Sequence, residues 1–207
     1  EVNTYDYKKP KYNVFAGYPL IGFNPDDGVK IGGVVNYTVN GFNRFPYTQR
    51  HVVKGNYYFA TSGYELSYKG IFPHLIGKWD FIVDAAYTSP NFTANFFGFG
   101  NETINDHKKT KELDYNRVKM RTIKATPSLR WVGEHGASVV TKLSFERISV
   151  DRTPNRYISQ PFAINADVFD YKNFGDFNAE YSFENYDNNS NPTLGMQFSL
   201  LGGFKMN

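Results

Sequence analysis

The chain has 207 residues with 23 basic and 20 acidic side chains, no cysteine, 16 tyrosines and 19 phenylalanines. The absence of cysteine excludes disulfides, thiolate metal sites and cysteine nucleophiles, and the net charge of +3 is too small to indicate nucleic-acid binding. No apolar run reaches the roughly 18 residues of a membrane helix. A transmembrane β-barrel remains compatible with this composition, because its strands alternate polar and apolar residues.

Alternation of apolar and polar residues runs along most of the chain, whereas helical periodicity is nearly absent. Between Trp79 and Thr88, for example, every second residue is apolar. The pattern predicts about nine antiparallel strands joined as an up-and-down meander. They lie near 12–23, 29–40, 50–60, 64–72, 79–89, 115–131, 137–150, 174–187 and 193–206.

The sixth expected strand changes phase along its length. Val118 and Met120 occupy one parity, whereas Ile123 and Leu129 occupy the other. A bulge near residues 121–122, or a strand that projects beyond its partners, would account for this change.

The connections between the expected strands differ in length in a regular way. Residues 41–49 and 73–78 form connections of intermediate length, and after the fifth strand long segments (90–114 and 151–173) alternate with short ones. All the long segments fall at one end of the meander. Barrels that cross an outer membrane have this asymmetry, with short turns on the periplasmic side and long loops outside.

Aromatic residues stand at both ends of two apolar faces, with smaller groups between them. Eight residues of strand, tilted by roughly 40°, rise about 20 Å, which is close to the height of the apolar band of a transmembrane barrel. The pattern therefore predicts a lipid-facing aromatic girdle of Tyr57, Phe59, Tyr64, Phe72, Trp79 and Tyr87. The opposite faces predict a polar lumen with Lys54, Glu65, Lys69, Asp80, Asp84, Lys142, Glu146, Glu180 and Glu184. A soluble barrel or sandwich would show the same alternation with its apolar face in the core, but ring placement and loop lengths favour the membrane.

No motif of the sequence predicts a catalytic, cofactor or metal site. The stretch "NFFGFGNETIND" (95–106) lacks the third glycine or the Gly-Lys-Ser/Thr ending of a phosphate loop, and no helical pattern follows it. The four histidines have no ligand spacing, and Asp80 and Asp84 would lie about 13 Å apart on one strand, too far for paired catalytic carboxylates. The basic residues His107, Lys108, Lys109 and Lys111, continued by Arg117, Lys119 and Arg121, indicate a solvated loop in preference to a lipid-phosphate contact.

Two long stretches and one short stretch carry a resemblance to a known family. "YNVFAGYPLIGFNPDDGVKIGGVVNYTVN", then "FPYTQRHVVKGNYYFATSGYELSYKGIFPHLIGKWDFIVDAAYTSPNF" and "NFFGFGNET" resemble the first half of the barrel of the outer-membrane insertion porin superfamily, or bacterial surface antigen family. The chain is most similar to versions in Bacteroidota in which the barrel follows a calcineurin-like phosphoesterase domain. The resemblance covers about residues 12–103, and the later strands fit mainly by pattern.

The resemblance implies a sixteen-stranded barrel that inserts or translocates proteins across the outer membrane, with a lateral seam between first and last strands. The seam strand would carry Tyr12, Val14, Ala16 and Tyr18, and 41–49 and 73–78 would be periplasmic turns. The late inward loop of the family, with its Val-Arg-Gly-type motif, and the closing strand have no match. We therefore expect a lead-in at 1–11 and an incomplete transmembrane barrel at 12–207.

The expected role is non-enzymatic, in a bacterial outer membrane, as an insertion or translocation barrel or as the membrane anchor of a larger surface or periplasmic protein. Its expected partners are outer-membrane lipid and either other envelope proteins or the remaining strands of its own barrel. No cofactor and no nucleic acid are expected. The alternatives are a small-molecule-binding or pore-forming barrel, or the barrel part of a membrane-anchored metallophosphoesterase.

Overall fold

A computed structural model describes residues 12–25, 27–41, 44–100, 114–160, 165–188, 190–191 and 193–207. Within these residues the protein is all-β and contains ten strands in one antiparallel sheet. The strands are β1 (Val14–Asn24), β2 (Gly28–Val39), β3 (Gln49–Tyr58), β4 (Gly63–Ile76), β5 (Trp79–Thr88), β6 (Thr93–Asn95), β7 (Arg117–Val132), β8 (Ala137–Val150), β9 (Lys172–Tyr186) and β10 (Gly195–Met206). Three short 3-10 helices accompany them: η1 (Glu134–Gly136), η2 (Tyr157–Ser159) and η3 (Ala166–Phe169).

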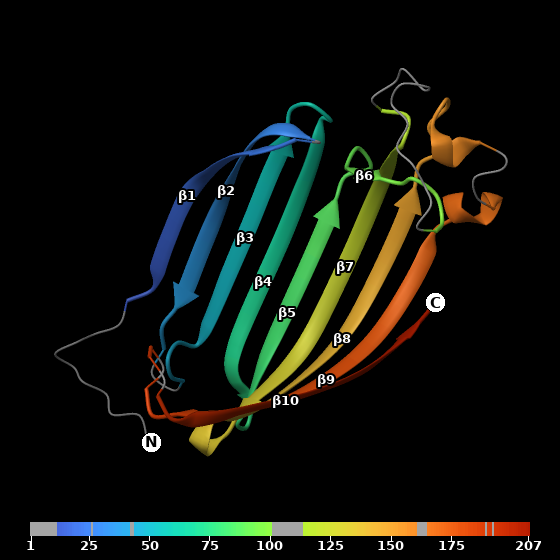
Figure 1. The fold of residues 1–207 in the computed structure, drawn as a ribbon. Coiled ribbons are helices and arrows are strands. Elements are labelled where there is room, and N and C mark those ends of the chain that lie inside the picture. The colour runs from blue at the N-terminus through green and yellow to red at the C-terminus, as the bar shows by residue number, and fades with distance from the viewer. Residues whose placement is uncertain are drawn as a thin grey trace.

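The strands follow one another across the sheet in the order β1-β2-β3-β4-β5-β7-β8-β9-β10, and β6 pairs beside them with β7 (Figure 1). This order confirms the expected antiparallel meander, and each of the nine expected strands is present. The unexpected strand, β6, has only three residues, too few for alternation to reveal it. The long connections lie together at one end of the sheet, above the tops of β5, β7 and β8 in Figure 1.

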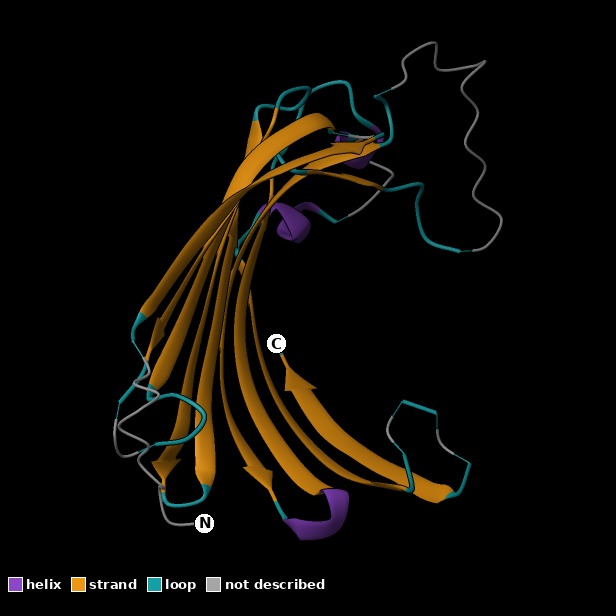
Figure 2. Ribbon diagram, turned by 90° about the vertical axis from the view of Figure 1, so that its left-hand side faces the viewer, coloured by secondary structure: helices purple, strands orange, loops and turns teal. Residues whose placement is uncertain are grey.

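The sheet is a single curved layer that does not close (Figure 2). In the described residues, β1 pairs only with β2 and β10 pairs only with β9. The structure therefore confirms a curved antiparallel sheet, but it does not show a closed barrel. Few apolar side chains are buried in the described part of the chain: Val34, Tyr58, Ile82, Val118 and Ile158. A two-layer soluble fold would cover one face of such a sheet with a second element.

The expected connection at 73–78 is wrong in its extent. β4 continues through Pro73 and His74 to Ile76, which pairs with Trp79, and the register shifts between Phe72 and Ile76. A proline has no N–H for the ladder and is tolerated at a bulge. The turn is thereby reduced to two residues, of which Gly77 has the positive φ of 61° that suits glycine.

Of the two explanations for the change of phase in the sixth expected strand, the bulge near residues 121–122 is wrong and the projecting strand is confirmed. The register of β7 runs without interruption from Thr122, opposite Thr88, to Trp131, opposite Trp79. Instead, β7 projects beyond the end of β5, and its first residues pair with β6. The change in parity arises because Val118, on the projecting part, is only 7% exposed although it shares the face that is polar lower in the strand.

No helix of the described residues is long and apolar enough to span a membrane.

Candidate functional site

One face of the sheet is apolar across all nine long strands, and we call it the apolar face. Each strand contributes at least one large aliphatic or aromatic residue to it: Ile21, Ile31, Val53, Leu66, Val83, Leu129, Leu143, Phe177 and Leu200. Most of these side chains are more than 40% exposed, as for Ile21 at 78% and Leu200 at 63%. In the described strands, and leaving out the bulge of β4, this face carries only four Asp, Glu, Lys or Arg residues. All four lie at the end with the long connections: Arg117, Lys119, Arg121 and Arg147.

The six residues predicted as a girdle all lie on the apolar face or directly continue it. Tyr57, Phe59, Tyr64 and Tyr87 stand near the long connections, and Phe72 and Trp79 stand near the short turns. Rings contact one another in pairs: Tyr57 with Phe59 at 5.3 Å between centroids, Tyr64 with Tyr87 at 5.8 Å, and Phe72 with Phe81 at 6.0 Å. The sequence did not indicate a further ring cluster on this face, in which His51 stacks between Tyr37 and Tyr68.

The opposite face, which we call the polar face, carries all nine residues predicted to line a lumen. They form cross-strand ion pairs: Lys54 with Glu65 at 3.8 Å, Lys69 with Asp84 at 3.4 Å, and Glu146 with Lys205 at 3.5 Å. Hydrogen bonds extend this network, as from the Asn56 side-chain amide to Glu65 (2.5 Å) and from Gln197 to Glu184 (3.2 Å). No ion pair in the described residues involves Lys142 or Glu180.

Asp80 has a partner that the sequence did not indicate. The Arg130 guanidinium on β7 donates two hydrogen bonds to Asp80 Oδ2, at 3.1 and 2.8 Å, and the backbone N–H of His74 donates to Oδ1 at 2.9 Å. Asp80 is 8% exposed. Since a charge this deeply placed needs paired donors, the bulge in β4 and the Arg130 side chain together hold the carboxylate at the end with the short turns.

Asp27 gathers the connections at the other end. Its carboxylate accepts hydrogen bonds from Asn24 (2.7 Å), Thr61 (3.3 Å) and Thr93 (3.1 Å), and the residue is 1% exposed. It thereby joins the β1–β2 turn, the β3–β4 turn and β6. The sequence indicated only a short connection between the strands near 12–23 and 29–40, because partners this distant along the chain leave no local pattern.

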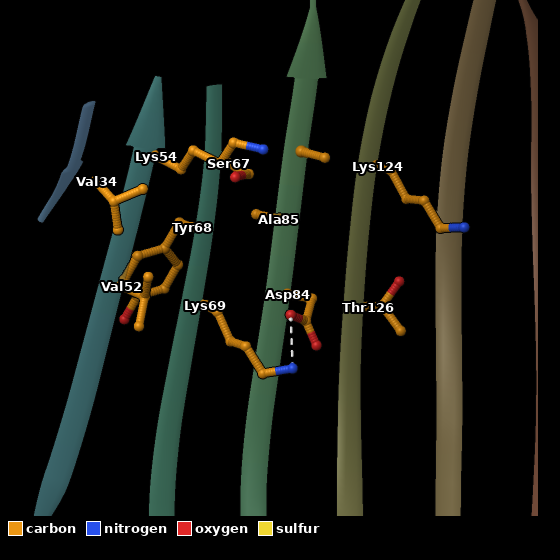
Figure 3. A pocket seen from close by; sticks show the side chains of 11 residues that line it. Val34, Val52, Lys54, Ser67, Tyr68, Lys69, Asp84, Ala85, Lys124 and Thr126 are labelled. Carbon is orange, nitrogen blue, oxygen red and sulfur yellow. Dashed lines mark ion pairs between the residues drawn. The ribbon is translucent and has the colours of Figure 1, made fainter. Parts of the chain in front are cut away.

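A hollow of about 350 Å³ lies over the middle strands (Figure 3). Its polar lining comes from Lys54, Lys69, Lys124, Asp84, Ser67 and Thr126, and the Lys69–Asp84 ion pair crosses it. Lys54 and Lys69 already pair with Glu65 and Asp84, so Lys124 is the lysine of the hollow for which the described residues show no ion pair. Among the described residues, no group of three or more His, Cys, Asp or Glu could hold a metal ion.

The glycine-containing stretch after β6 packs on the second long connection. Phe96 contacts Phe99 at 5.5 Å and Tyr157 at 6.0 Å between ring centroids. Gly98 and Gly100 have φ of 103° and 105°, which favour glycine. Residues 101–106 of this stretch and the basic residues His107, Lys108, Lys109 and Lys111 lie outside the described residues.

The residues predicted for a seam lie at a free edge of the described sheet. Val14, Ala16 and Tyr18 share one face of β1. Tyr12 precedes β1, and its carbonyl accepts a hydrogen bond of 2.6 Å from the Asn40 side chain.

Comparison of the chain with protein-family models, curated proteins and solved structures gave no match.

Proposed function

We propose that the chain forms part of the wall of an outer-membrane β-barrel of the insertion-porin type, with its apolar face toward lipid and its polar face toward a hydrated lumen. The observation that carries the proposal is the uninterrupted apolar face. Nine strands about 4.8 Å apart, each crossing the band over a length of eight residues at about 3.3 Å per residue, make a surface of roughly 1,000 Å². The largest apolar patch on a typical soluble monomer is roughly 300–600 Å².

Two further observations support this placement. Rings occur near both ends of the apolar face, as expected where strands pass from hydrocarbon to headgroups. The longest connections, which join β5 to β7 and β8 to β9, lie at the end that also carries the β1–β2 and β3–β4 turns, and the connections at the other end are shorter. The end with the long connections would therefore face outward and the other end the periplasm.

Within such a barrel, the proposed role is protein insertion or translocation, or anchoring of a larger surface or periplasmic protein. The support for this finer role is the sequence resemblance together with the free edge of β1, where the resemblance places the seam strand. A barrel that anchors a metallophosphoesterase rests on the resemblance alone.

The membrane placement is tested with Trp79 and Trp131, which pair directly on the apolar face. The barrel that contains this chain, with the strands that pair with its two edges, is refolded into phosphatidylcholine vesicles and floated on a density gradient. It is then exposed to lipid that carries bromine near the headgroups, which quenches indoles at that depth. We expect co-flotation and strong quenching by brominated lipid. A chain that stays at the bottom of the gradient as a folded, soluble species would refute the proposal.

A second candidate, small-molecule binding, rests on the hollow of the polar face, where Lys124 forms no ion pair in the described residues. Equilibrium dialysis with small carboxylates and phosphates tests it. Saturable binding that Lys69→Gln and Lys124→Gln abolish would support it, and the absence of binding would dismiss it.

A further inference from the structure

Three cations that end the apolar face have no acidic partner in the described part of the chain. Lys119 and Arg121 lie on β7 and Arg147 lies on β8, all on the apolar face at the end with the long connections. We call these three residues the cationic rim. Arg117 shares the face but forms an ion pair of 3.0 Å with Asp114. No carboxylate of the described residues forms an ion pair with the cationic rim.

The contacts of the two arginines are with neutral groups. Both guanidinium groups lie over the ring of Tyr171, at 5.6 Å for Arg121 and 5.7 Å for Arg147. Arg121 donates a hydrogen bond to the Tyr171 hydroxyl (2.8 Å), and Arg147 donates one to the Asn173 side-chain oxygen (2.7 Å). Two like charges are thus gathered on one ring, and a guanidinium has five donors, so most of their N–H groups stay available for an anion.

The strand register sets the height of the cationic rim relative to the apolar face. Ile123 lies opposite Tyr87, a member of the ring row at this end, and Arg121 is the next residue on the same face. Two residues of strand, tilted by roughly 40°, correspond to about 5 Å of height. If the ring row marks the boundary of the hydrocarbon, the cationic rim lies at the depth of the lipid headgroups.

We propose that the cationic rim binds the phosphate group of an anionic lipid headgroup. A guanidinium matches phosphate oxygens with two parallel donors, and two of these groups contact the Tyr171 ring. The inference rests on the proposed function, since the headgroup reaches the cationic rim only if the apolar face lies in a membrane.

The test compares lipid binding by the full chain and by two double variants in neutral detergent micelles. Arg121→Gln with Arg147→Gln removes two charges from the rim. Lys142→Gln with Lys205→Gln removes two charges from the polar face, on β8 and β10, outside the hollow. Native mass spectrometry measures binding of phosphatidic acid, of phosphatidylcholine and of inorganic phosphate.

We expect the unaltered chain to bind phosphatidic acid more tightly than either other probe. The arginine variant should lose about thirty-fold in affinity and each single arginine variant about five-fold, from the usual strength of one cation at an anionic surface. The lysine variant should bind as the unaltered chain does. Equal losses in both double variants, an unchanged arginine variant, or inorganic phosphate bound as tightly as phosphatidic acid would overturn the inference.

Flotation of each protein on phosphatidylcholine vesicles separates the two proposals. A chain that floats without preferring phosphatidic acid would overturn the cationic rim and leave the membrane placement intact. A chain that does not float would overturn both. If the double arginine variant fails to float although the unaltered chain does, the single variants decide the outcome.

Discussion

Two neighbouring valines on β3 offer a direct test of which face meets lipid. Val53 lies on the apolar face, opposite Val35 and Tyr68, and is 48% exposed. Val52 lies on the polar face, opposite Lys69, and lines the hollow. The same change, valine to arginine, can therefore be made at adjacent positions that differ only in the face they occupy.

The expected effects differ because the two side chains would enter different surroundings. Val53 is four residues along β3 from Tyr57, which belongs to the rings near the long connections. At a tilt of roughly 40° this distance corresponds to about 10 Å of height, so Val53 lies near the middle of the apolar band. An arginine at the bilayer midplane lowers the free energy of unfolding of a membrane barrel by about 2–4 kcal/mol. At Val52 the guanidinium would lie in a hydrated hollow beside both Lys69 and Asp84, whose opposite charges offset one another, so we expect a loss below about 1 kcal/mol.

The measurement is equilibrium unfolding in guanidinium chloride from phosphatidylcholine vesicles, followed by the fluorescence of Trp79 and Trp131. Val53→Arg should shift the midpoint strongly and Val52→Arg only slightly. Equal destabilisation by the two variants, or a larger effect at Val52, would refute the assignment of faces. A soluble fold with the apolar face in its core could reproduce the difference, so the same two variants are also compared for co-flotation, which only a lipid-facing position affects in vesicles.

Three further outcomes follow from single side chains. Arg130→Met should lower the free energy of unfolding by about 1–3 kcal/mol, because it leaves the Asp80 carboxylate without its charged donor, and adding Asp80→Asn should restore part of the loss in the same unfolding assay. Asp27→Ala should destabilise the end with the long connections by about 1–3 kcal/mol, because three accepted hydrogen bonds are lost. Amide exchange at Ala60 should then be faster, and unchanged exchange would contradict the role given to Asp27. Hydrogen bonds from Thr193 and from the backbone N–H of Leu194 lower the pKa of Asp187, in the β9–β10 turn, to about 2. Because this pKa lies below the usual 3.8, the carboxylate should stabilise the turn at all pH values above about 4 and lose this effect as the pH falls toward 2. The protection of the Thr193 amide against exchange should therefore decrease as the pH falls toward 2. In Asp187→Ala this dependence on pH should be abolished.

The sequence predicted the strands and their faces well because both depend on local backbone geometry. Side chains of a strand alternate between faces with a period of two, so Lys54, Glu65 and Lys69 could be assigned to one face before any pairing was known. The errors occurred where polarity did not follow face. Pro73 and His74 were predicted to lie in a connection, although they belong to the bulge of β4. Val118 suggested a change of phase, because its side chain is buried on the polar face at that end.

Partners across the sheet could not be predicted, because they depend on register. The meander placed β5 beside β7, but the pairing of Asp80 with Arg130 also requires the register between these strands, and the length of the intervening segment gives no such information. The gathering of Asn24, Thr61 and Thr93 on Asp27 involves residues far apart in the chain. One signal was present for the register of β5 and β7, since Trp79 and Trp131 stand near the turn ends of their strands and pair in the structure.

The directions of the two edge strands restrict how the proposed barrel can close. Each of the nine long strands is antiparallel to its neighbour, so β1 and β10 run in the same direction. Direct pairing of β1 with β10 would therefore be parallel, whereas an all-antiparallel barrel requires an odd number of further strands between them. Unpaired backbone groups of a strand in hydrocarbon cost several kcal/mol each, so in a membrane both edges must find partners. The expected sixteen-stranded barrel meets this condition, because the seven strands that it adds to the nine are odd in number.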